Sequence, residues 1–346
     1  MRTALLLTLP AFAALAVAAD VPKTPEVKFT ESRLDNGLRV IVAEDHDAPT
    51  FSICVTYNVG SRDERKGRTG FAHLFEHMMF KGSEKVGPGE HFYLVFTNGG
   101  NMNGTTNQDR TTYFETLPKN QLDLGLFLEA DRMRSLAVTK ENLDNQRNAV
   151  QEERRLGIDN RPYGLTYEKI SELAYDNFAY KHSVIGSMED LNAASVEDVR
   201  DFFKTYYAPN NAVLAIVGDV KTADVVARAK KYFGDIPRQE PAKPVDLSEP
   251  PPSGERRLEI KDKLARLTQL VIVYKIPESG HPDTDAMGVL GMILGGGESS
   301  RLYQRLVKEK ELATSVFAYG AGRKGPGLFQ ITAMVRPGKK PEEVEA

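Results

Sequence analysis

Three polar side chains that could do chemistry lie close together in the helical pattern of residues 69–82, TGFAHLFEHMMFKG: His73, Glu76 and His77. At 100° per residue they share one stripe, opposite a broad arc of Phe, Ala, Leu and Met. Histidines at i and i+4 point the same way, so both can bind one metal ion, and the carboxylate at i+3 can act as a general base. Ordinary core or capping histidines are the alternative. The coincidence of the pair with a glutamate, in a chain with only 6 histidines, favours a metal site.

A third ligand is expected because a catalytic zinc takes three protein ligands and keeps one position open. The candidate lies in residues 142–157, NLDNQRNAVQEERRLG. On a helical wheel Leu143, Ala149, Val150 and Leu156 mark the buried arc. Glu153 lies near the middle of this arc, where a carboxylate is costly unless it is paired or coordinated. We therefore predict Glu153 as the third ligand of one Zn²⁺ per chain, with Glu152 as the reserve. A pair of solvated glutamates is the alternative.

Charge and cysteine usage exclude several other classes of protein. The net charge is −3 and no basic cluster stands out, so a nucleic-acid partner has no support. Cys54 is the only cysteine, which excludes an intrachain disulfide and a cysteine-rich metal site. Its strand-like surroundings predict a small buried hydrophobe.

The N-terminus has the pattern of a secretory signal peptide. Arg2 precedes an apolar run from Ala4 to Val17, and the small residues Ala18 and Ala19 lead into Asp20. The run is short for a membrane span of about 20 residues, although an uncleaved anchor is the alternative. We predict a signal peptide over residues 1–19, no stable membrane span after its removal, and export, with the bacterial periplasm as the default location.

The remaining pattern predicts an α+β protein of two domains. Alternating residues around the DNG turn at 35–37 predict a hairpin, and the helix of the histidines is expected to begin after Gly70, with Thr69 as N-cap, and to stop at Gly82. We predict a first, zinc-binding domain over residues 24–236, a proline-rich linker over 237–256 and a second domain over 257–346. The second domain is expected to be incomplete, because a new helix pattern begins just before Ala346.

The motif HLFEH, the inversion of the thermolysin-like zinc motif, resembles the HxxEH signature of the pitrilysin/insulinase family of metallopeptidases. The 75 residues between His77 and Glu153 are similar to the family spacing. The segments GGNMNGTTNQDRTTYFETLP, YAPNNAVLAIVGDV and LGGGESSRLYQRLVKEKELATSV also resemble family segments. The layout is similar to that of exported bacterial members and of the mitochondrial processing peptidase β-subunit.

The resemblance implies two similar α/β sandwich domains that face each other across a chamber, and it implies that the second domain, residues 257–346, is of the inactive peptidase type. It implies zinc held by His73, His77 and Glu153, with Glu76 as the base in the hydrolysis of unfolded peptides or small proteins. An extended peptide substrate would add to an edge strand at Asn103, Gly104 and Thr105. An ordinary threonine-rich strand is the alternative for that last segment.

One departure from the family concerns the substrate-binding arginine and tyrosine of the second domain. Their positions hold Val307 and Thr314 here. Arg301 and Arg305 lie nearby but are expected to be surface residues. We therefore expect this chain to be the zinc-bearing subunit of a homodimer or heterodimer whose partner carries the arginine and tyrosine. The alternative is a non-catalytic structural or assembly subunit of the same superfamily.

Overall fold

Six strands with alternating burial form the first sheet of the computed structural model, which describes residues 26–251 and 253–346. The predicted signal peptide lies outside the described residues. The strands are β1 (Thr30–Arg33), β2 (Arg39–Glu44), β3 (Thr50–Tyr57), β4 (Asn101–Thr106), β5 (Thr111–Pro118) and β6 (Ala212–Gly218). Their order is β1-β2-β6-β3-β5-β4, with β2 and β6 parallel and the other pairs antiparallel. The mixed sheet confirms the predicted α+β class, and β1–β2 is the predicted hairpin.

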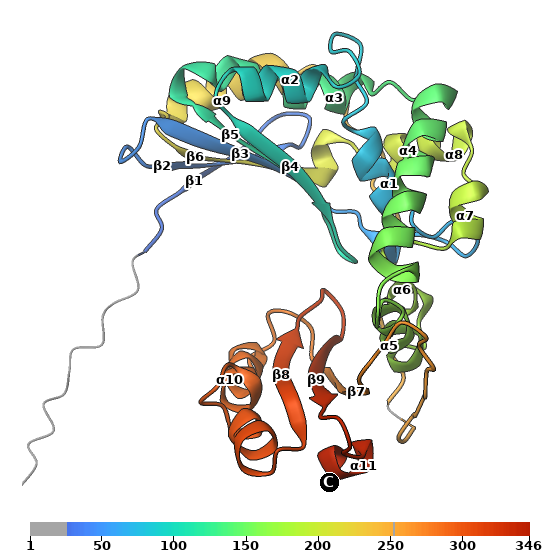
Figure 1. Ribbon diagram of the computed structural model, residues 1–346. Helices are drawn as coiled ribbons and strands as arrows, with labels where there is room; N and C mark the ends of the chain where they lie inside the picture. The colour runs from blue at the N-terminus through green and yellow to red at the C-terminus, as the bar shows by residue number, and fades with distance from the viewer. Residues whose placement is uncertain (1–25, 252) are drawn as a thin grey trace, which may run out of the picture.

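The two faces of this sheet have different chemistry. On one face β3 buries four large apolar side chains beneath α3 (Leu122–Ser135) and α9 (Thr222–Phe233) (Figure 1): Phe51, Ile53, Val55 and Tyr57. On the opposite face the same strand presents Ser52, Cys54 and Thr56, all only partly buried. The prediction of a buried Cys54 was wrong, because the strand alternation places its side chain on this second, open face.

Most other helices gather at the β4 end of the sheet, to the right in Figure 1. They are α1 (Phe71–Met78), α4 (Lys140–Arg154), α5 (Thr166–Ala174), α6 (Phe178–Lys181), α7 (Met188–Asn192) and α8 (Val196–Tyr206). The helix α2 (Glu90–Thr97) lies instead above the sheet, beside α3 and α9, in Figure 1. A π-helical turn continues α4 over Arg155–Asp159. Within the described residues, no helix is long and apolar enough to cross a membrane.

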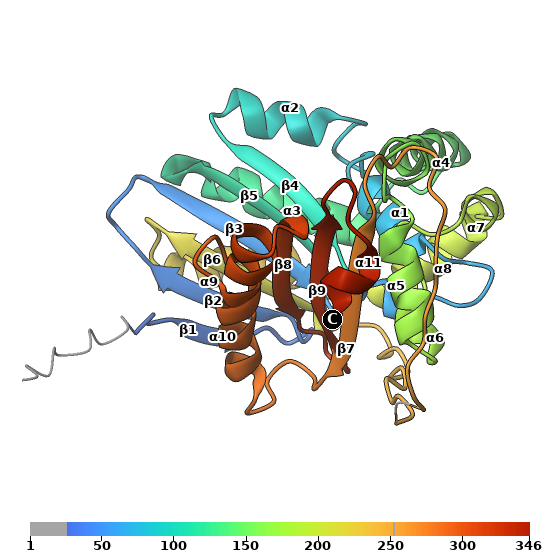
Figure 2. The same cartoon turned by 60° about the horizontal axis from the view of Figure 1, so that its bottom comes forward.

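A second, three-stranded sheet forms from the C-terminal part of the chain. Its antiparallel strands β7 (Gln269–Ile276), β8 (Ala313–Ala321) and β9 (Gly327–Val335) have the order β7-β9-β8. The helix α10 (Thr284–Gly295) packs on β8, and a π-helical segment (Tyr303–Glu309) and α11 (Pro341–Glu345) complete this part. The sheet lies below the open face of the first sheet in Figure 1 and in front of it in Figure 2.

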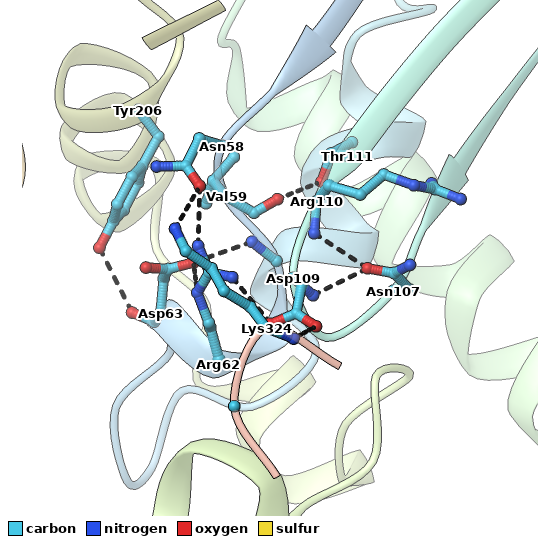
Figure 3. A network of polar contacts seen from close by, with 12 residues as sticks. Asn58, Val59, Arg62, Asp63, Asn107, Asp109, Arg110, Thr111, Tyr206 and Lys324 are labelled. Atoms are coloured by element: carbon cyan, nitrogen blue, oxygen red, sulfur yellow. Dashed lines mark hydrogen bonds and ion pairs between the residues drawn. The ribbon is translucent and has the colours of Figure 1, made fainter. Parts of the chain in front are cut away.

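A network of hydrogen bonds centred on Asp109, called the polar joint below, connects the two sheets (Figure 3). Asp109, in the turn between β4 and β5, accepts hydrogen bonds from Arg62 Nη1 at 2.7 Å and from the Tyr180 hydroxyl at 2.7 Å. Its other oxygen accepts from the backbone N–H of Lys324, in the loop between β8 and β9, at 2.9 Å. Arg62 is buried and also donates to Asn58 Oδ1 at 2.8 Å. The tip of the β4–β5 hairpin is therefore held against the second sheet.

Replacing Asp109 by alanine is expected to lower the free energy of unfolding by about 2–3 kcal/mol, because the buried Arg62 loses its short ion pair. Denaturant unfolding followed by circular dichroism measures the change. Asp201→Ala, on the exposed side of α8, is the control and should change stability by less than about 0.5 kcal/mol. Equal stabilities of the two variants would show that the joint contributes nothing to folding.

Candidate metal centre

A buried carboxylate anchors the start of α1. Gly70 adopts a left-handed conformation with φ of 84°, and its N–H donates to Glu64 at 2.9 Å. The N–H of Ala72 donates to the other Glu64 oxygen at 2.8 Å, and His182 Nε2 lies 3.0 Å from the same carboxylate. Glu64 thereby satisfies two free N–H groups at the helix start, where negative charge is also favoured by the helix dipole.

This helix begins after Gly70 as predicted, but its predicted cap and C-terminal end were wrong. Thr69 does not cap α1, because its hydroxyl donates to Asp190 Oδ2 at 2.6 Å. The helix ends at Met78, four residues before Gly82, and the chain then turns toward α2. The difference in the cap arises because the partner of Thr69 is distant in sequence, which the local pattern of capping residues does not contain.

The three predicted ligands converge where α1 meets α4. His73 Nε2 lies 3.6 Å and His77 Nε2 3.4 Å from Glu153 Oε2, and all three donor atoms lie within 4.8 Å of one another. Zinc–nitrogen and zinc–oxygen bonds of about 2.0–2.1 Å in tetrahedral geometry place the donor atoms about 3.4 Å apart. The observed separations therefore suit a zinc ion.

The protonation states of His73 and Glu153 also suit a metal. Burial, followed by the neighbouring His77, lowers the pKa of His73 to about 4, so its imidazole is neutral at pH 7. The hydrogen bond with His77 is the main cause that lowers the pKa of Glu153, which is therefore ionised. Neutral imidazoles and an ionised carboxylate are the forms that bind Zn²⁺. The donor set thus fits the group in chemistry as well as in spacing.

Glu153 joins this cluster from a position different from the predicted one. Its side chain is 50% exposed, and Leu156, which was expected in the buried arc, is 66% exposed. Ala149 is exposed as well. The buried side of α4 is formed instead by Leu143, Gln146, Val150 and Gln151. Gln151 donates to Asn192 of α7 at 2.8 Å, so polar residues also lie on the buried side of α4. The helical wheel assumed that only apolar residues are buried, and it therefore predicted the wrong buried side.

The reserve ligand, Glu152, lies outside the cluster. Its carboxylate is exposed and accepts a hydrogen bond from Arg155 Nη1 at 3.0 Å on the surface of α4. The two adjacent glutamates therefore have different surroundings, and only Glu153 faces the two histidines of α1.

Glu76, the predicted base, is held between α1 and β4. Its residue is only 8% exposed, and the Thr106 hydroxyl donates to its Oε2 at 2.5 Å. Burial raises the pKa of Glu76, while the hydrogen bond from Thr106 opposes the rise. Gly104 makes room for this carboxylate, since a Cβ there would lie 3.1 Å from both Cγ and Oε1 of Glu76.

The predicted substrate-binding segment lies on β4, which is the edge strand of the first sheet. Asn103 and Thr105 are exposed, whereas Gly104 is buried and faces Glu76. An edge strand presents unpaired N–H and C=O groups, to which an extended peptide can pair. The role of Asn103, Gly104 and Thr105 in substrate binding stays a prediction, and the structure places all three on an edge strand.

A second group of possible metal ligands lies in the core of the first domain. His91, Glu115 and Glu129 are all buried, and His91 Nε2 lies 3.4 Å from Glu115 Oε2. Both carboxylate oxygens of Glu129 accept from Arg132, whose guanidinium lies 4.4 Å from the ring centre of Tyr113. Burial raises the pKa of Glu115 to about 7. Burial lowers the pKa of His91 to about 3, so His91 is neutral, and Glu129 with Arg132 forms the buried ion pair of this group.

The two positions that depart from the family pattern belong to the second sheet. Val307 is buried in the small apolar core there, and Thr314 is exposed with its hydroxyl 3.4 Å from the Met334 carbonyl oxygen. Arg305, expected at the surface, is exposed and lies 3.9 Å from Glu309, while Arg301 is exposed as well. The described residues thus offer no arginine–tyrosine pair at these two positions.

Sequence reasoning missed Thr106 and Glu64, which orient the base and anchor its helix. The alternation of β4 contained a signal for Thr106, because it places this side chain on the same face as Gly104. No local pattern points to Glu64, which lies in a loop and meets His182 across 118 positions of the sequence.

Comparisons with known proteins identify the family of this chain. The family model described as Insulinase (Peptidase family M16) matches residues 39–187, and the model described as Peptidase M16 inactive domain matches residues 193–346. The zinc protease PqqE of Helicobacter pylori is 33% identical over 321 residues, which cover 92% of this chain and 72% of that protein.

Two further similarities extend the comparison. The crystal structure of a protease from Helicobacter pylori has a TM-score of 0.88 at 33% identity and covers 92% of this chain and 77% of that one. The probable mitochondrial-processing peptidase subunit beta of Arabidopsis thaliana is 26% identical, over 93% of this chain and 62% of that protein. By sequence and by fold, this chain belongs to the insulinase family of peptidases, family M16.

Proposed function

We propose that this protein is a zinc-dependent endopeptidase that hydrolyses unfolded peptides or small proteins. The observation that carries the proposal is the convergence of His73, His77 and Glu153 beside Glu76 and the edge strand β4. The names of similar proteins, such as the zinc protease PqqE of Helicobacter pylori, support the same reaction class.

The residues of the site divide the reaction between them. His73, His77 and Glu153 would hold one zinc ion, which when bound polarises the substrate carbonyl and activates a water molecule. Glu76 Oε1 would accept the proton of the attacking water, because Oε2 already accepts from Thr106. The same oxygen would then deliver the proton to the leaving amine.

The substrate would bind as an additional strand along β4. Backbone groups of Asn103 and Thr105 at the sheet edge would pair with the peptide, and the Thr105 carbonyl oxygen would exchange its present hydrogen bond from Arg110 Nη1, at 2.7 Å, for one from the substrate. Side chains of the substrate would alternate between the two faces. Hydrogen bonds between backbones do not depend on the side chains of the substrate, so they do not select a particular sequence. They require an extended segment with free backbone groups, which most segments of a folded protein lack. This geometry therefore favours unfolded chains.

A partner subunit and an exported location complete the proposal. Val307 and Thr314 leave the second sheet without the family arginine and tyrosine, so a homologous subunit would supply them in a homodimer or heterodimer. The name of the Arabidopsis relative describes a subunit, which supports such a pair. The N-terminal pattern of residues 1–19 supports export, with the periplasm as the expected compartment.

Cleavage of a mixed pool of unstructured peptides tests the proposal. The mature chain loaded with one equivalent of zinc is expected to cleave the pool, and removal of zinc by a chelator is expected to stop cleavage until zinc is restored. The assay is repeated with an added arginine- and tyrosine-bearing homologue. Zinc binding without cleavage under both conditions would overturn the peptidase assignment and favour a structural or assembly subunit.

A further inference from the structure

The hydrogen bond between Thr106 and Glu76 connects β4, the proposed substrate-binding strand, with α1, the helix that carries the proposed base. Glu76 belongs to α1, with both histidines, whereas Thr106 is the last residue of β4, the proposed substrate strand. The donor–acceptor distance of 2.5 Å is at the short end for a hydroxyl and a carboxylate. Such a charge-assisted bond is both stronger and more directional than a bond between neutral groups.

The register of the sheet fixes the position of the Thr106 hydroxyl. Thr106 pairs with Thr111 of β5, and its Oγ1 lies 3.4 Å from the Thr111 hydroxyl. The Thr111 hydroxyl itself donates to the Val59 carbonyl oxygen at 2.9 Å. Thr106 therefore points at Glu76 from a backbone that is held in place by the neighbouring strand.

The surroundings of Glu76 leave its carboxylate little freedom. Gly104 faces Cγ and Oε1 so closely that a Cβ would reach 3.1 Å, and that Cβ would lie 3.2 Å from the ring of Phe80. Thr106 holds the other oxygen, Oε2. One oxygen is thus bound and the other is kept in a fixed direction, which is the arrangement that a positioned base needs.

We propose that Thr106 is a positioning residue: its hydroxyl orients the Glu76 carboxylate so that Oε1 receives the proton of the attacking water. This inference rests on the proposed peptidase function. Because Thr106 and the proposed substrate contacts lie on one strand, β4 would fix the position of the substrate relative to the Glu76 carboxylate. A substrate carbonyl placed by β4 is then automatically placed relative to Glu76.

Thr106→Val removes the hydroxyl with little change of shape, and Thr106→Ser keeps it. In Thr106→Val we expect kcat to fall about 10-fold to 100-fold, since a displacement of about 1 Å in a catalytic group has an effect of this size. KM is expected to stay within about twofold, because backbone pairing along β4 persists. Thr106→Ser is expected to restore kcat to within about threefold of the wild type, because the donor to Glu76 is regained.

Two readouts that do not depend on turnover accompany the kinetics. Zinc affinity should be equal in all variants, because the predicted ligands lie on α1 and α4. Crystal structures should show a single orientation of the Glu76 carboxylate in the wild type and in Thr106→Ser. In Thr106→Val the carboxylate should be rotated or should occupy two alternate orientations. The control is Thr112→Val, which removes a hydroxyl that pairs with Thr56 at 3.1 Å in the same sheet and should leave kcat unchanged.

Three results would overturn the inference: unchanged kcat in Thr106→Val, an equal loss in Thr106→Ser, or a loss that follows a lower zinc affinity or unfolding midpoint. Failure of the proposed function is recognised separately, because the wild type would then not cleave at all. In that case the orientation of Glu76 in the crystals decides the positioning role alone.

Discussion

Glu76→Gln is expected to reduce kcat/KM for peptide cleavage by about 10²-fold to 10⁴-fold, the range typical of general base catalysis. The amide has the shape of the carboxylate and can still accept the hydrogen bond from Thr106, but it cannot accept a proton from water. The effect should therefore appear in kcat. Initial rates on a fluorogenic peptide from the cleaved pool, at several substrate concentrations, give kcat and KM separately.

Zinc content and a matched variant make this result interpretable. Glu76 is not a predicted ligand, so Glu76→Gln should bind zinc with the wild-type stoichiometry. Glu172→Gln makes the same chemical change on α5, where the carboxylate is exposed and pairs with Lys169, and should retain full activity. Cleavage by Glu76→Gln at the wild-type rate would rule out this residue as the base.

Glu153→Ala is expected to weaken zinc binding by on the order of 10³-fold, because it removes one of three protein ligands. Loss of a mere hydrogen-bond partner of a ligand typically weakens a metal site by about 10-fold to 100-fold, and loss of the ligand itself should exceed this. Competition with a chromophoric chelator at pH 7.5 measures the affinity. Peptide cleavage should disappear at zinc concentrations that saturate the wild type.

The adjacent Glu152 supplies a close control for Glu153. Glu152→Ala removes the same number of atoms from the same helix, but its carboxylate contacts only the surface residue Arg155 among the described residues. Its zinc affinity should match that of the wild type. Zinc should also stabilise the wild type and Glu152→Ala against heat, by about 2.7 kcal/mol at 100 times the dissociation constant, and should do so far less for Glu153→Ala. Equal affinities in the two alanine variants would exclude Glu153 as a ligand.

The sequence by itself determined the elements and the chemical character of the site. The stripe of His73, Glu76 and His77 follows from helical periodicity, which is visible within two turns. The alternation of β3 and the DNG turn predicted strands and a hairpin, because side-chain direction in a strand depends only on neighbouring residues. Glu153 was identified correctly as a member of the cluster, although the wheel argument assigned it to the wrong side of α4.

Only the tertiary structure decided which partners these elements meet. Thr106 reaches Glu76 across 30 positions, Glu64 reaches His182 across 118, and Lys324 reaches Asp109 across 215. Such contacts depend on how sheets and helices pack, and no local window of sequence contains both partners. The same reason explains why Glu64, and not Thr69, satisfies the free N–H groups at the start of α1. Periodicity thus specified which residues could act, and packing specified which of them are held in position to do so.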